Sequence, residues 1–76
     1  MRIKKEIIDR INNVQTRMRL AGILGIGEAM LYDHINRNKP GGRLTRIDAL
    51  LAIAEELGIP QSEVSSLVEE DQSVKV

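Results

Sequence analysis

Glycine and proline cut this chain into short segments in which apolar residues recur at helical spacing. In residues 3–14 the apolar stripe consists of Ile3, Ile7, Ile11 and Val14, at intervals of four, four and three. This spacing places the four side chains on one face of a helix. A short helix of this kind is stable only when its apolar face packs on neighbouring elements. The pattern therefore predicts several short helices packed together.

Four further helices are expected, over residues 16–24, 28–36, 46–57 and 61–70. Thr16 can cap the first of these, and Gly25 can end it in the left-handed conformation. In the helix expected over residues 46–57, Thr45 can be the N-terminal cap and Gly58 can end the helix. Pro60 suits the first turn of the helix expected over residues 61–70. The expected inward residues are Leu20, Ala21, Leu24, Leu31, Ile35, Ile47, Leu50, Leu51, Ala54, Leu57, Val64, Leu67 and Val68. We therefore predict an all-α fold, a compact bundle of five short helices.

The composition excludes several kinds of site. The 76 residues include no Cys and a single His, which leaves no thiolate zinc site and no set of metal ligands. Tyr32 is the only aromatic residue, which argues against proteins that stack single-stranded bases on aromatic rings. No apolar run approaches the roughly 18 residues of a membrane span, and the start lacks the apolar core of a signal peptide. We expect a cytoplasmic protein that contacts no membrane.

No enzyme class finds support in the sequence. It contains no nucleophile with a neighbouring base, no carboxylate pair and no phosphate loop in a supporting context. We expect no catalytic residue, no cofactor, no bound metal and no small-molecule ligand.

Charge is divided unevenly along a chain whose net charge is zero. Residues 1–46 carry ten Lys or Arg and four acids, whereas residues 47–76 carry one Lys and seven acids. A basic region of this kind can attract a polyanion even when the total charge is zero. The alternative is that surface charges cluster by chance.

The most informative motif joins the second and third expected helices. Ala21 is small enough to let the next helix cross closely, and Gly25 permits a tight turn. Ile26 can pack its side chain against the inner side of the turn, and Leu31 can anchor the following helix in the core. This order of residue types is typical of a helix-turn-helix.

Three segments together resemble the Cro/CI-type, lambda repressor-like family of phage and bacterial transcription regulators, in particular its phage CI-repressor variant. They are "EIIDRINNVQTRMRLAGILGI", "LGIGEAMLYDHI" and "RIDALLAIAEELGIP", and the resemblance runs from Ile3 to about Leu67. It implies a lambda repressor-like bundle with the helix-turn-helix at the second and third helices. It also implies a sequence-specific regulator, a repressor that binds double-stranded DNA as a homodimer on a near-palindromic operator.

By that resemblance, a recognition helix at about residues 27–36 enters the major groove. The residues that would face the bases are Gly27, Glu28, Ala29, Tyr32, Asp33 and Asn36. A helical wheel drawn with Leu31 inward also turns most of this face, with Arg37, away from the core.

Glu28, Asp33 and His34 depart from what such a helix commonly carries, and Tyr32 has several possible contacts. Glu28 can accept a hydrogen bond from cytosine, or it can simply be favoured by the helix dipole. Asp33 can contact a base or pair with Arg37 one turn later. Tyr32 can reach a phosphate, touch a thymine methyl group or pack at the edge of the core. His34 stands where the family usually has an aliphatic residue, so either the helix is rotated slightly or His34 is half exposed.

Basic residues surround the expected recognition helix in the sequence. In the fold that the chain resembles, these regions flank the groove and contact phosphates. The expected phosphate-binding residues are Arg17, Arg19, Arg37, Asn38, Lys39, Arg43 and Arg46. We interpret Lys4, Lys5 and Arg10 as a solvated helix face.

The domain assignment is a helix-turn-helix domain over residues 1–68 and an acidic, flexible tail over residues 69–76. The dimer interface is expected between Val64 and Val76, where "SVKV" could add a short strand. The main alternative function is a protein-interaction module, antirepressor-like or antitoxin-like, that uses the same fold without binding DNA. Its support is the acidity of Glu28, Asp33 and the second half of the chain, where a solvated acidic face is the simpler interpretation.

Overall fold

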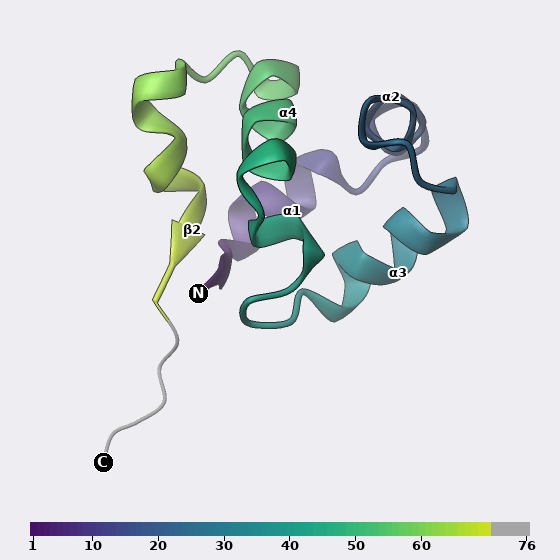
Figure 1. The fold of residues 1–76 in the computed structure, drawn as a ribbon, viewed down its shortest axis with the longest axis horizontal. Coiled ribbons are helices and arrows are strands. Elements are labelled where there is room, and N and C mark those ends of the chain that lie inside the picture. Colours follow the sequence, from purple (N-terminus) through teal and green to yellow (C-terminus); the bar gives the residue numbers. More distant parts are fainter. Residues whose placement is uncertain (71–76) are drawn as a thin grey trace.

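The computed structural model describes residues 1–70, and these form a small helical bundle (Figure 1). The elements are β1 (Arg2–Ile3), α1 (Lys5–Ile11), α2 (Val14–Leu24), α3 (Glu28–Arg37), the 3-10 turn η1 (Arg43–Thr45), α4 (Ile47–Leu57), the 3-10 segment η2 (Gln61–Leu67) and β2 (Val68–Glu69). The predicted all-α class is confirmed. Within the described residues, the only sheet is the antiparallel pair β1–β2, two residues to a strand.

Helix α4 lies at the centre of the bundle. In Figure 1 it stands between α2 and α3 on one side and η2 on the other. The largest fully buried side chains are aliphatic and come from nearly every element: Ile3, Ile11, Leu20, Leu31, Ile35, Ile53 and Leu67. This shared core places α2 and α3 in contact along one edge of the bundle.

The first helix is shorter than expected at both ends. Ile3 lies in β1, where it pairs with Val68, so α1 begins only at Lys5. The helix ends at Ile11, and Val14 opens α2 with 57% of its surface exposed. Ile7 and Ile11 are buried as predicted, but the stripe does not extend to Val14.

Both threonine caps were wrong. Asn13 caps α2, because its Oδ1 accepts a hydrogen bond from the Thr16 N–H at 2.9 Å, and Thr16 itself is buried inside the first turn. The Thr45 hydroxyl donates instead to the Gly42 carbonyl at 2.7 Å, one turn earlier in η1. The expected helix ends at Gly25 and Gly58 are confirmed, since both adopt the left-handed conformation.

The buried face of α4 is rotated from the predicted one. Ile47, expected inside, is 64% exposed because it stands in the first turn, beyond the edge of the bundle. Ala49, Ala52 and Ile53 are buried in its place. A helix packed on two sides needs small residues where its neighbours approach closely, which explains the buried alanines.

The fifth helix is a run of 3-10 turns that ends at Leu67, so the predicted helix over 61–70 was too long. Glu63 has φ −113° and ψ 17°, which interrupts any regular helix, and Val68–Glu69 are extended to pair with β1. Glu69, expected to open the tail, thus belongs to the folded unit. The rest of the expected tail, including "SVKV", lies in residues 71–76, outside the described residues.

Candidate nucleic-acid interface

Helices α2 and α3 are joined by only three residues, 25–27. Gly25 turns the chain with φ 70°, and the Ile26 N–H donates to the Ala21 carbonyl at 3.1 Å, which closes the end of α2. Figure 1 looks down the axis of α2 while α3 runs across the view, so the two helices cross at a steep angle. Leu31 and Ile35 hold α3 in the core with almost no exposed surface.

The opposite face of α3 is open to solvent. All of the expected base-facing residues are exposed: Gly27, Glu28, Ala29, Tyr32, Asp33 and Asn36. Gly27 stands at the N-cap, and the others recur at intervals of one, three, one and three along the helix. This spacing gathers them on one face, as the helical wheel predicted for Ala29, Asp33 and Asn36. His34 is half-buried beside that face, which is one of the two alternatives given above.

Arg17 of α2 lies over this face at its N-terminal end. Its guanidinium carbon is 4.8 Å from the centre of the Tyr32 ring, a cation–π contact, and its Nη1 donates to Asn12 at 2.8 Å. Together with Glu28 and Ala29 the two side chains line a shallow hollow. Tyr32 is therefore 49% exposed and stacked under an arginine, which differs from the core-edge packing considered above.

Arg19 has a different environment, although only two residues separate it from Arg17. Its Nε donates to the Glu56 carboxylate of α4 at 2.7 Å. This hydrogen bond, and secondarily the charge of Glu56, raise the pKa of Arg19 above its ordinary value. The pair directs Arg19 towards α4, and a phosphate would have to compete with Glu56 for it.

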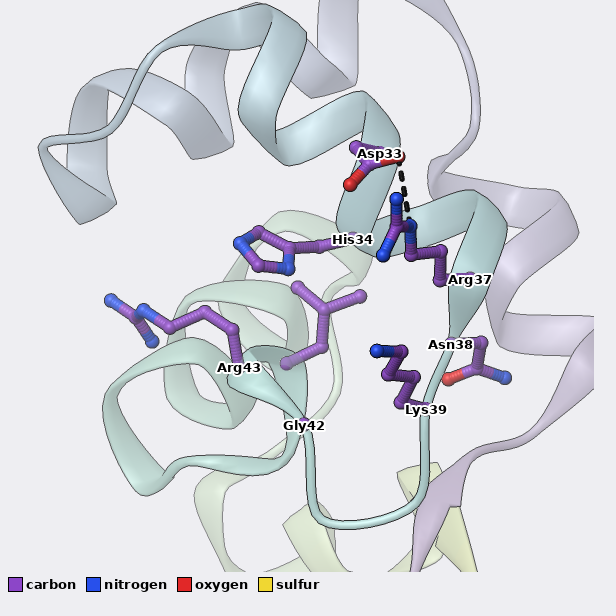
Figure 2. Close-up of a pocket in the computed structure, with 8 residues that line it drawn as sticks. Asp33, His34, Arg37, Asn38, Lys39, Gly42 and Arg43 are labelled. Carbon is purple, nitrogen blue, oxygen red and sulfur yellow. Dashed lines mark hydrogen bonds and ion pairs between the residues drawn. The ribbon is translucent and has the colours of Figure 1, made fainter.

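Cations also gather at the other end of α3, around a hollow of about 190 Å³. Figure 2 shows His34, Arg37, Lys39 and Arg43 around this space. Asp33 is the one carboxylate among the lining residues, and it accepts a hydrogen bond from Arg37 Nε at 3.1 Å. The alternative of an Asp33–Arg37 pair is thus observed, and base contact by Asp33 stays a prediction.

Arg43 is held in place by Asp48 of α4. Its two terminal nitrogens donate to the two carboxylate oxygens at 3.0 and 3.1 Å, and the side chain is only 17% exposed. The hydrogen bond from Arg43 is the main cause that lowers the pKa of Asp48. The Ala49 N–H and the charges of Arg43 and Arg46 act in the same direction, against partial desolvation. Arg43 is thereby fixed at the rim of the hollow.

Asn38 has a structural part that the sequence did not reveal. It is in the left-handed conformation (φ 43°) and ends α3. Its Nδ2 donates to the Ile3 carbonyl at 2.8 Å, and its Oδ1 accepts from the Ile3 N–H at 3.2 Å. Figure 2 shows this amide directed away from Lys39. Asn38 thus forms a clamp that ties the end of α3 to β1, and its expected phosphate contact stays a prediction.

His34 is the member of this cluster that the sequence assignment missed. Its position three residues before Arg37 was a usable signal, because such residues share a helix face. Residues 39–44 lie beside that face because the chain turns after α3, where the Gly42 N–H donates to the Lys39 carbonyl at 3.0 Å. The turn is a feature of the tertiary structure.

Comparisons with known proteins identify no relative: no family model matches the chain, and no curated protein or solved structure matches it significantly. Over residues 1–70, none of the helices combines the length and apolar character needed to cross a bilayer. In the same part of the chain, no three His, Asp or Glu residues are grouped closely enough to hold a metal ion.

Proposed function

We propose that this protein is a sequence-specific, duplex-DNA-binding transcription regulator that inserts α3 into the major groove. The observation that carries the proposal is the open face of α3. It follows a three-residue turn, it is anchored from behind by Leu31 and Ile35, and it has cations at both ends. An α-helix with one free face and short polar side chains has the dimensions of the major groove.

The cations suit the backbone contacts that position such a helix. Arg17 lies at the N-terminal end of the face, and Lys39 and Arg43 lie beyond its C-terminal end. Phosphate contacts on both sides of a groove set the register of the helix and supply salt-dependent affinity. The resemblance to Cro/CI-type regulators, which bind as homodimers, leads to the same proposal from the sequence.

One set of observations favours the second candidate, a protein-interaction module. Met30 on α3, and Val14, Met18 and Ile23 on α2, are large apolar residues with more than half of their surface exposed. Exposed apolar side chains in such number on two adjacent helices are more typical of a protein contact than of a phosphate backbone. On this alternative, the same edge of the bundle binds a protein partner.

Salt-dependent binding to duplex DNA separates the two. For a DNA regulator, a fluorescent random-sequence duplex should bind at 50 mM salt and lose affinity steeply towards 200 mM. Selection from random duplexes should then return one symmetric motif, whose half-site spacing reports the dimer. Absence of binding to any duplex at low salt would contradict the DNA function and leave the interaction module as the better proposal.

A further inference from the structure

We propose that the hollow at the C-terminal end of α3 binds a single phosphate group and that His34 is one of its anion-binding residues. Binding at this site is therefore stronger when His34 is protonated. The proposal rests on the DNA-binding function for the source of the phosphate, the DNA backbone, but the site itself is defined by the residues around it.

The charges that line the hollow favour an anion. Arg37, Lys39 and Arg43 contribute three positive charges, and Asp33 contributes one negative charge that Arg37 already neutralises. Lys39 makes no ion pair with any residue in the described part of the chain. The formal charge of the lining is thus +2 when His34 is neutral and +3 when it is protonated, and Asp48 behind Arg43 lowers each value by one.

The size of the hollow suits a phosphate group. A cavity of about 150 Å³ accommodates a benzene molecule, which has six heavy atoms. The hollow of about 190 Å³ is therefore large enough for the five heavy atoms of a phosphate, and it is open to solvent along one side. Two contacts shape its rim: Arg43 is bonded to Asp48, and the chain turns tightly from Lys39 to Gly42.

His34 couples anion binding to pH. It faces Asp33 and Arg37 of its own helix, Lys39 of the following loop, and Arg43 of η1, behind which lies Asp48 of α4. An anion in the hollow attracts the positive charge of a protonated imidazole. Histidine changes its charge between pH 5 and 8. Protonation of His34 and anion binding therefore favour each other, by reciprocal linkage.

The first test uses His34 as its own reporter. It is the only histidine in the chain, so one imidazole proton resonance follows its charge across a pH titration. Sulfate serves as the probe because its charge is constant from pH 5 to 8, and chloride at equal ionic strength is the reference. We expect sulfate to move the titration midpoint to higher pH by several tenths of a unit. Lys39→Ala should reduce this shift, and Arg10→Ala, a charge loss on α1, should preserve it. Equal midpoints in sulfate and chloride would overturn the site.

The second test measures duplex binding at pH 8.0 and pH 5.5 and at constant salt. From a charge–charge interaction near a surface, we expect the wild-type affinity to rise about threefold to tenfold at the lower pH. His34→Asn and His34→Gln should remove this rise, and Arg10→Ala should keep it. Circular dichroism at both pH values confirms that each variant is folded.

The outcomes distinguish the site from the DNA function. If sulfate moves the His34 midpoint but no duplex binds, the site is supported and the DNA function fails. If duplexes bind but His34→Asn retains the full pH dependence, the DNA function is supported and the part of His34 is refuted.

Discussion

The cations at the two ends of α3 differ in how the protein holds them. On the α2 side, Arg17 is stacked over Tyr32, and Arg19 is bonded to Glu56 of a different helix. At the C-terminal end of α3, Arg37, Lys39 and Arg43 surround one hollow together with His34. The partners of the first group direct its two arginines to different places, whereas the cations of the second group line the same space.

This difference shows that a count of basic residues does not describe a binding surface. Arg17 and Arg19 carry the same charge and lie two residues apart in the sequence, yet only Arg17 lies over the open face of α3. Arg43 also has a carboxylate partner, but Asp48 holds it beside the hollow. Both carboxylates belong to α4, so a carboxylate can turn a cation away from a surface or fix it there, depending on where the pair lies relative to that surface.

The largest expected effect comes from Asn38, which ties the C-terminal end of α3, beside the hollow, to β1. Asn38→Ala removes two hydrogen bonds to Ile3 and places alanine in a left-handed conformation. We expect a loss of about 2–4 kcal/mol in the free energy of unfolding, measured by urea denaturation. Asn38→Gly keeps the backbone conformation and should lose less. Asn36→Ala, on the exposed face nearby, should stay within about 0.5 kcal/mol of wild type; a loss as large as that of Asn38→Ala would contradict the clamp.

The next effect compares Arg43 with Arg19 in DNA binding. Arg43→Ala should weaken binding to every duplex alike, by about threefold to tenfold, and reduce the salt slope by about one. Arg19→Ala should change affinity less than about twofold, because Glu56 already occupies its guanidinium. Anisotropy titrations over a salt series give both quantities, with Arg10→Ala as the charge-matched control. Equal losses at Arg43 and Arg19 would show that both flanks contact the backbone equally.

Asp33 should alter specificity more than affinity. Asp33→Asn removes a negative charge from the groove-facing surface and frees Arg37 from its pair. We expect somewhat tighter binding to all duplexes and a changed preference at one or two base pairs, read by selection from random sites before and after the substitution. An unchanged motif would mean that Asp33 contacts no base and acts only through its helix-stabilising pair with Arg37.

Substitutions of Tyr32 and Arg17 test their cation–π contact through the free energy of unfolding. Tyr32→Leu keeps an apolar side chain and removes the aromatic ring below Arg17. The expected loss is about 0.5–1 kcal/mol in the free energy of unfolding, the usual size for an exposed cation–π contact. Combining Tyr32→Leu with Arg17→Ala in a double-mutant cycle isolates the contact. Strict additivity of the two losses would argue against it.

The smallest effect concerns the Asp48 pair and depends on pH. The pKa of Asp48 is lowered in the folded protein, so its contribution is present above the unfolded-state pKa of about 3.9 and is lost as pH falls through the lower folded-state value. Asp48→Asn should therefore lower the melting temperature modestly at pH 7, with the difference from wild type shrinking as pH falls below the unfolded-state pKa. A difference that does not shrink on acidification would mean that the substitution acts through something other than charge.

The sequence alone determined the helical segments and the open face of α3. Apolar periodicity and the left-handed preference of Gly25 and Gly58 depend on residues a few positions apart, so they are visible without the fold. The same local geometry predicted that Leu31 and Ile35 would turn inward.

The tertiary structure decided everything that depends on distant partners. Asn38 meets Ile3 across 35 residues and Arg19 meets Glu56 across 37, and no local pattern signals either contact. The strand pairing that shortens the first and last helices is equally remote in sequence. Helix periodicity specifies which way a side chain points, but only packing specifies what it meets. For that reason the sequence predicted the face of α3, whereas the hollow beside it, with His34 in its lining, became visible only in the folded protein.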